Sequence, residues 1–193
     1  MNEKFLCGFT QCYLPFGDLN MDMKHSGEIS DYKRTLDLTE SMLTVEYACE
    51  NVCYKREYFI SFPDEVMAIR LSADQPASIF ADLWLESPLK YVCEVGDGKF
   101  VLDGECPSGA AVRTADIEKG YIYPEDPEEK GIQFRGGMKV LPEGGGVVSV
   151  EEDGQQMLRV EGADSVVVLF TIKTSFNGYD KLPVVEGREY RQP

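Results

Sequence analysis

The sequence predicts an all-β protein, an antiparallel sandwich of two sheets. Apolar and polar residues alternate with a period of two along most of the chain, which is typical of half-buried strands. Turns rich in Gly, Asp and Pro recur roughly every ten residues, and no segment has a convincing amphipathic helical pattern. Because this pattern continues throughout, we expect one sandwich domain over residues 1–193.

The first half of the chain contains five expected strands. Residues 18–23 alternate strictly, and residues 42–49 and 52–61 form a hairpin across the turn at Glu50, Asn51 and Val52. Two further strands, residues 65–73 and 77–87, are separated by an Asp-Gln-Pro turn.

The second half repeats this organisation. A Gly-Asp-Gly turn at 96–98 is a hairpin signal before the strand expected at 98–106. Residues 120–131 carry two prolines and a run of carboxylates, which predicts an exposed acidic loop within the domain. The last four strands are expected at 132–142, 146–153, 156–162 and 164–173.

Composition excludes several classes of function. Asp and Glu number 34 against 19 Lys and Arg, which gives a net charge of −15. The sequence has no local basic patch, so binding to nucleic acid or to an anionic membrane surface is not expected. No apolar run is long enough to span a bilayer, and the N-terminus lacks the pattern of a secretory signal, so a cytoplasmic location is favoured for the chain as given. Six cysteines without a Cys-x-x-Cys pair predict free thiols and no metal or other cofactor, although Cys49 and Cys53 could face each other across their hairpin.

Catalytic signals are weak. The single histidine, His25, lies in a polar turn and is expected to be a solvated surface residue. No Gly-x-Ser-x-Gly motif accompanies it, and the glycine-rich stretch 141–150 precedes a strand instead of a helix, so nucleotide binding is excluded. Among 34 acidic residues the sequence does not single out a catalytic pair.

Two features are candidates for contact with a carbohydrate or another domain. Trp84 alternates with two leucines and faces outward, free to stack on a sugar, if those leucines face the core. The loop after the last strand has an Asn-Gly pair that favours a turn with positive φ and projects its aromatic side chains outward, either toward a ligand or as a wedge against a neighbouring domain. The candidate loop residues are Ser175, Phe176, Asn177, Tyr179, Asp180 and Lys181.

Several stretches resemble, in order, the N-terminal β-domain of glycoside hydrolase family 95, the inverting alpha-L-fucosidases, and of related family 65 enzymes. They are Phe9 to Met23, Gly27 to Tyr47, Tyr54 to Ala73, Gly137 to Gly145 and Val160 to Gly187. The four-residue motifs that are most specific for this family are Asp31-Tyr32-Lys33-Arg34 and Ser175-Phe176-Asn177-Gly178.

The resemblance implies a galactose-mutarotase-like β-supersandwich of two antiparallel sheets, incomplete in this chain. In the family this domain is joined by a helical linker to an (α/α)6 barrel, which carries the catalytic glutamic acid, aspartate and asparagines. None of these falls within this chain, so no catalytic residue is carried over. The family domain normally opens with a stretch such as ALPLGNGRLGA, which is missing here, so the chain is expected to begin within the domain. A bacterial source is implied by the resemblance alone.

We therefore expect a non-catalytic N-terminal domain that supports a helical barrel, covalently linked or separately encoded, and forms part of the rim of its sugar pocket. A free-standing carbohydrate-binding module for fucosylated glycans, or a fragment that interacts with a separate partner, is the alternative. Sheet edges left unpaired would favour a homo-oligomer.

Overall fold

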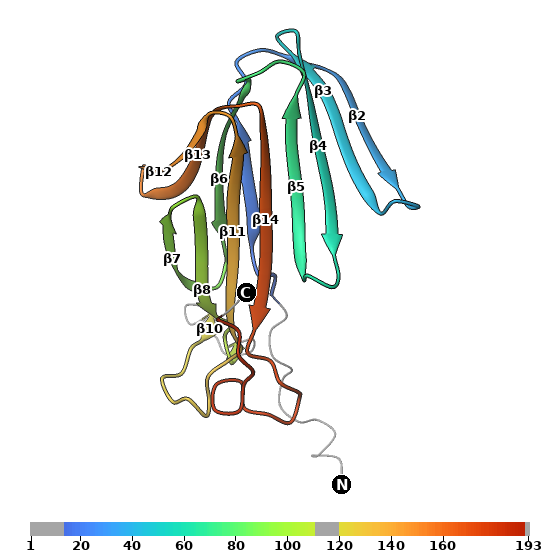
Figure 1. Cartoon of the computed structure of the whole chain (residues 1–193). Coiled ribbons are helices and arrows are strands. Elements are labelled where there is room, and N and C mark those ends of the chain that lie inside the picture. The colour runs from blue at the N-terminus through green and yellow to red at the C-terminus, as the bar shows by residue number, and fades with distance from the viewer. Residues whose placement is uncertain (1–13, 111–119, 192–193) are drawn as a thin grey trace.

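The chain folds into two antiparallel sheets that pack face to face (Figure 1). A computed structural model describes residues 14–110 and 120–191. Within these ranges there is no helix, and hence no helical segment that could cross a membrane. The predicted all-β, two-sheet sandwich is confirmed.

The larger sheet has eight strands in the order β2-β3-β4-β5-β14-β11-β8-β7. Its central strand β14 joins two blocks that are distant in sequence, since it pairs with β5 on one side and with β11 on the other. The bounds are β2 Ile29–Asp37, β3 Met42–Cys49, β4 Val52–Ser61, β5 Val66–Ala73, β7 Lys90–Gly96, β8 Lys99–Glu105, β11 Gln133–Glu143 and β14 Ser165–Thr174.

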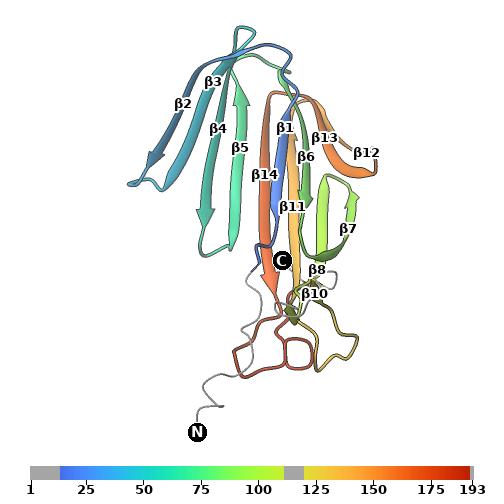
Figure 2. The ribbon, with the colours of Figure 1, turned by 180° about the vertical axis from the view of Figure 1, so that it is seen from behind.

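The smaller sheet has four strands in the order β1-β6-β13-β12 and covers one half of the larger sheet (Figures 1 and 2). A short ladder of β9 (Gly109–Ala110) and β10 (Tyr121–Ile122) lies apart from both. The bounds of the four strands are β1 Asp18–Met23, β6 Ile79–Glu86, β12 Gly146–Glu152 and β13 Gln155–Ala163.

The core lies between the sheets and follows from the period-two pattern. On β6 every second side chain, Ile79, Ala81, Leu83 and Leu85, is at most 1% exposed and faces the larger sheet. Val166 and Val168 of β14 and Leu102 of β8 face them from the other side, also at 0% exposure. Each buried Leu or Val contributes about 1.5–3 kcal/mol relative to an exposed one, so this layer dominates stability.

The β3–β4 hairpin corrects one expectation about the cysteines. Its turn contains two residues, Glu50 and Asn51, both in the left-handed region at φ 51° and 65°, as a type I′ turn requires. Cys49 therefore pairs with Val52 and Cys53 with Ala48, so that Cys49 is buried while Cys53 is exposed on the opposite face. The prediction that the two cysteines could face each other was wrong, but the expected free thiols are confirmed for Cys49, Cys53, Cys93 and Cys106.

Strand β2 was not predicted from its own pattern. A bulge shifts the β2–β3 register between Ser30 and Lys33, and Asp31 has φ 52°, so alternation is interrupted within the strand. Every residue of β2 is exposed. The strand therefore has no buried face that would produce an alternation of apolar and polar residues in the sequence. Adjacent strands β3 and β4 match the expected bounds 42–49 and 52–61.

Candidate functional site

The candidate loop after β14 lies at the end of the larger sheet where β11 begins, beside the acidic loop 120–131 (Figure 1). Ser175 fixes it there. Its backbone N–H donates to the carbonyl oxygen of Gln133 at 2.8 Å, and its Oγ accepts the N–H of Gln133 at 3.0 Å. The N–H of Arg188 donates to the Ser175 carbonyl at 3.1 Å, which holds the returning chain on the same residue. Ser175 is only 2% exposed, so its role is to anchor the loop instead of contacting a ligand.

Glu186 organises the interior of the loop. Its Oε2 accepts the backbone N–H of Leu182 at 3.2 Å, and its Oε1 lies 3.4 Å from Lys181 Nζ. The N–H of Leu182 and the charge of Lys181 lower the pKa of Glu186. Asn177 Nδ2 donates to the Glu186 carbonyl at 2.8 Å, so Asn177 and Lys181 both bind Glu186 within the loop itself.

The aromatic residues of the loop point to solvent. Gly178 has φ 121°, in agreement with the positive φ predicted for the Asn-Gly pair. Phe176 is 44% exposed, Tyr179 is 97% exposed, and Asp180 is also exposed. Two aromatic side chains are thus displayed on a loop that is hydrogen-bonded in place.

Trp84 lies elsewhere in the molecule. It is on β6 of the smaller sheet between the buried Leu83 and Leu85, so it faces outward, as the alternation predicts. The ring is half-buried, and its Nε1 donates weakly to Glu86 Oε2 at 3.5 Å. Because it belongs to the other sheet, Trp84 and the loop after β14 form two separate surfaces.

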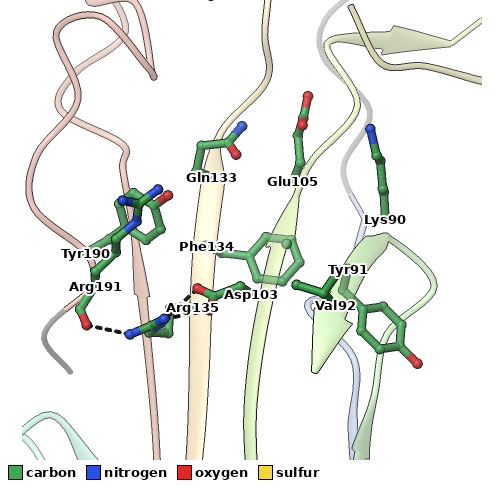
Figure 3. Close-up of a pocket in the computed structure, with 11 residues that line it drawn as sticks. Lys90, Tyr91, Val92, Asp103, Glu105, Gln133, Phe134, Arg135, Tyr190 and Arg191 are labelled. Carbon is green, nitrogen blue, oxygen red and sulfur yellow. Dashed lines mark hydrogen bonds and ion pairs between the residues drawn. The ribbon is translucent and has the colours of Figure 1, made fainter. Parts of the chain in front are cut away.

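A pocket that the sequence did not predict adjoins the loop. It has a volume of about 450 Å³ and lies where β7, β8 and β11 meet the C-terminal segment (Figure 3). Backbone pairing aligns Lys90, Glu105 and Gln133 across the three strands at one end of it. The lining residues are Lys90, Tyr91, Val92, Asp103, Gly104, Glu105, Gln133, Phe134, Arg135, Tyr190 and Arg191.

The first carboxylate of this pocket is neutralised. Asp103 accepts two hydrogen bonds from Arg135, at 2.8 Å from Nε and at 2.6 Å from Nη2 (Figure 3). Arg135 Nη1 also donates to the carbonyl oxygen of Arg191 at 2.9 Å, which closes the C-terminal segment over the pocket. A bidentate pair of this kind holds both side chains in one geometry and occupies both carboxylate oxygens of Asp103.

The second carboxylate, Glu105, has unused capacity. The residue is 7% exposed, its Oε2 lies 3.8 Å from Lys130 Nζ, and its buried Oε1 has no hydrogen-bond partner. A buried acceptor without a donor is unfavourable, so a ligand that brought a hydroxyl or amide donor would be stabilised there. One free carboxylate does not supply the two that glycoside hydrolysis uses.

His25 differs from its expectation. Its Nε2 lies 2.9 Å from the Tyr47 hydroxyl, and its ring packs on Tyr54 with centroids 4.4 Å apart. It is half-buried, and burial together with the charge of Arg56 lowers its pKa. The prediction of a solvated surface histidine was therefore wrong; the residue packs the connection between β1 and β2 against the larger sheet.

Comparison with known proteins gives the class of this domain. The chain is 30% identical over 178 residues to the Alpha-L-fucosidase 2 of Arabidopsis thaliana, covering 89% of this chain and 21% of that protein. It therefore spans about a fifth of this curated relative. The solved structure of a "Putative kojibiose phosphorylase from human microbiome" superposes with a TM-score of 0.51 at 12% identity, over 88% of this chain and 24% of that one, and supports the fold alone. The chain is an N-terminal domain of a glycoside hydrolase.

The family follows from a match that covers almost the whole chain. The chain belongs to the family described as glycosyl hydrolase family 65, N-terminal domain, whose model matches residues 1–179. The family 65 and alpha-L-fucosidase resemblance drawn from the sequence is confirmed.

Proposed function

We propose that this chain is the non-catalytic N-terminal domain of an alpha-L-fucosidase-like glycoside hydrolase, and that it supports a catalytic helical barrel. The loop 174–187 would form part of the rim of the sugar pocket. The observation that carries the proposal is the display of Phe176 and Tyr179 on a loop fixed by buried Ser175, in a chain related to an alpha-L-fucosidase.

The proposed contact with the barrel follows from the energetics of exposed aromatics. A large apolar side chain held in water by an ordered loop gains free energy when a neighbouring surface covers it. Because Glu186 and Ser175 already order the loop, docking would cost little conformational entropy. A rigid loop with two outward aromatic rings is therefore suited to a fixed interface.

Two measurements test this function. The purified chain should release no fucose from a fucosyl-galactoside above the buffer rate, since Glu105 is the only carboxylate lining the described pocket that is free of a bidentate ion pair. Hydrogen exchange should then show protection of residues 175–181 when the barrel domain of a related alpha-L-fucosidase is added, and Tyr179→Asp should abolish it. Fucose release by the chain, or a barrel domain that binds without protecting the loop, would overturn the proposal.

The second candidate function is carbohydrate binding, favoured by the unpartnered Oε1 of Glu105 and by Tyr190, which both line the pocket. Sugar hydroxyls would donate to Glu105 and a sugar ring would pack on the tyrosine. Titration with fucosylated oligosaccharides should then show millimolar or tighter binding that Glu105→Gln weakens. Binding that is instead lost in Trp84→Ala or Tyr179→Ala would place the glycan on those surfaces, and no binding would reject this candidate.

A further inference from the structure

One half of the larger sheet has an uncovered inner face. Strands β2, β3 and β4 lie beyond β1, the outermost strand of the smaller sheet, and no described element lies over most of their length (Figures 1 and 2). At one end, His25 of the β1–β2 connection contacts Tyr47 and Tyr54, and the Tyr54 hydroxyl donates to the carbonyl oxygen of Ser78 in the β5–β6 connection at 3.3 Å. The sandwich is therefore two layers thick on one side and one layer thick on the other.

This uncovered surface, the open face, is apolar and aromatic. Tyr58 and Ile60 of β4 pair with Ile69 and Met67, which face the core, so the open face continues the core side of the sheet. Ile60 is 75% exposed, Leu36 64%, Tyr32 61% and Ile29 54%. The open face comprises Ile29, Tyr32, Arg34, Leu36, Leu43, Val45, Arg56, Tyr58 and Ile60.

The other face of the same strands has the composition expected of a surface in water. It carries Lys33, Glu46, Lys55 and Glu57 alongside Phe59, and Lys55 is paired with Glu57 at 2.7 Å, so charged side chains predominate there. If both faces had to be solvated, both should be polar. The contrast indicates that the open face is covered when the protein is fully assembled.

Two free strand edges border the open face. β1 is the outermost strand of the smaller sheet, and β2 is the outermost strand of the larger one. Along each of these edges, no described strand pairs with the backbone N–H and C=O groups. Unpaired edges of this kind accept a strand from another chain.

We propose that two copies of this chain associate about a two-fold axis, with each open face packed on the other. In this arrangement β2, β3 and β4 of the second copy occupy the layer of the smaller sheet, and their edge strand β2 lies beside β1 of the first copy. The symmetry repeats the contact, so both open faces are covered and both pairs of free edges meet. One two-fold rotation thus covers both open faces and pairs the free edges of β1 and β2 in both copies.

The size of the contact is sufficient for a specific dimer. Three strands spaced about 4.8 Å apart, with about eight residues each at 3.3 Å per residue, present a flat area of roughly 400 Å² per copy. Two such areas total roughly 800 Å², and because accessible surface exceeds flat area, side-chain relief and the paired edges should bring the buried surface to about the 1,000 Å² total that distinguishes specific interfaces.

Charge on the open face gives the dimer a characteristic salt dependence. Arg56 donates to the Tyr47 hydroxyl at 3.0 Å, but its Nε has no partner, and Arg34 lies on the same face. Both copies therefore bring cations to the interface, and each chain has a net charge of −15. Added salt screens both repulsions, so association of two copies tightens with salt, whereas binding of an acidic strand from a different protein would weaken.

The test measures the mass of the full chain by size-exclusion chromatography with light scattering, at several concentrations and salt levels. We expect twice the chain mass of 21.7 kDa at micromolar concentration, with tighter association at higher salt. Ile60→Asp on the open face should weaken the dimer at least tenfold. Phe59→Asp is the matched control, because Phe59 is the adjacent residue of β4, is 44% exposed and faces the other side.

Leu36→Asp on β2 gives a second test if Ile60→Asp fails to fold, which circular dichroism would reveal. A folded monomer at all concentrations, a dimer that tolerates both open-face variants, or a dimer disrupted equally by Phe59→Asp would overturn the proposal. Association that weakens as salt is raised would overturn it too.

Discussion

Replacing Asp82 by Asn tests the polar centre of the smaller sheet. Asp82 is 1% exposed although it lies on the outer face of β6. Its Oδ1 accepts Arg159 Nε at 2.7 Å, and its Oδ2 accepts Arg159 Nη2 and Lys24 Nζ, both at 2.8 Å. One carboxylate thus joins β13 to the chain that follows β1.

The magnitude follows from the three bonds. Asn retains one acceptor oxygen and presents an NH₂ group to cationic donors, so most of the charge-assisted bonding is lost, at about 1.5–3 kcal/mol per bond when the partners are buried. Lys24 and Arg159 side chains are 43% and 26% exposed and regain some hydration in the variant. We therefore expect Asp82→Asn to lower the free energy of unfolding by about 2–4 kcal/mol. This loss is smaller than the sum of the three hydrogen-bond contributions.

The pH dependence has a definite sign. Hydrogen bonds from Arg159, and then those from Lys24, lower the pKa of Asp82 in the folded protein. A carboxyl whose folded pKa is depressed contributes its full stability above the unfolded pKa of about 4 and loses it as pH falls toward the folded pKa. The difference between wild type and Asp82→Asn should be constant from about pH 5 to 7 and should shrink below about pH 4.

Urea unfolding followed by circular dichroism measures both effects. Asp22→Asn is the control, because Asp22 is 52% exposed and its ion pair with Lys24, at 2.6 Å, lies in water, so its loss should cost less than about 1 kcal/mol. A penalty below about 1 kcal/mol for Asp82→Asn at neutral pH, or one that does not change on acidification, would refute this account of the ion pairs.

Three other substitutions test the core, a close contact and the loop anchor. Leu158→Ala removes a side chain at 0% exposure and should cost about 2–5 kcal/mol in urea unfolding; a smaller loss would mean that the core relaxes into the cavity. Gly104→Ala should cost about 1–3 kcal/mol or more, because the added Cβ would overlap the Phe134 ring, and an unchanged melting temperature would contradict this. Ser175→Ala removes the Oγ that accepts the N–H of Gln133 and should lower the free energy of unfolding by about 1–3 kcal/mol. Limited proteolysis should then cut residues 176–187 faster. Unchanged cleavage would show that the backbone bonds alone anchor the loop.

Sequence reasoning succeeded where neighbours in the chain are also neighbours in the sheet. The β3–β4 hairpin was predicted because each strand alternates and a short turn connects them, and the hairpin signal at 96–98 corresponds to the turn between the paired strands β7 and β8. The outward orientation of Trp84 followed from the same alternation. Its use as a sugar platform stays a prediction, as does the role of the loop 175–181.

The pocket was missed for a physical reason. Asp103 and Glu105 alternate on β8, but their partners Arg135 and Gln133 belong to β11, which is separated from β8 by the acidic loop. Nothing in the local pattern states that β8 pairs with β11, so the ion pair and the free oxygen of Glu105 appear only in the folded structure. His25 was misjudged similarly, because its aromatic partners lie on β3 and β4.

The position of β14 in the larger sheet also constrains how the protein is made. It comes after all the other described strands along the chain, yet it is the one that unites β2–β5 with β11, β8 and β7. Until residue 174 has left the ribosome, the nascent polypeptide holds two incomplete half-sheets whose apolar surfaces are in water. Folding of this domain is therefore expected to be slow and late during translation, and chaperones that shield emerging strands should raise its yield more than that of a protein built from local hairpins alone.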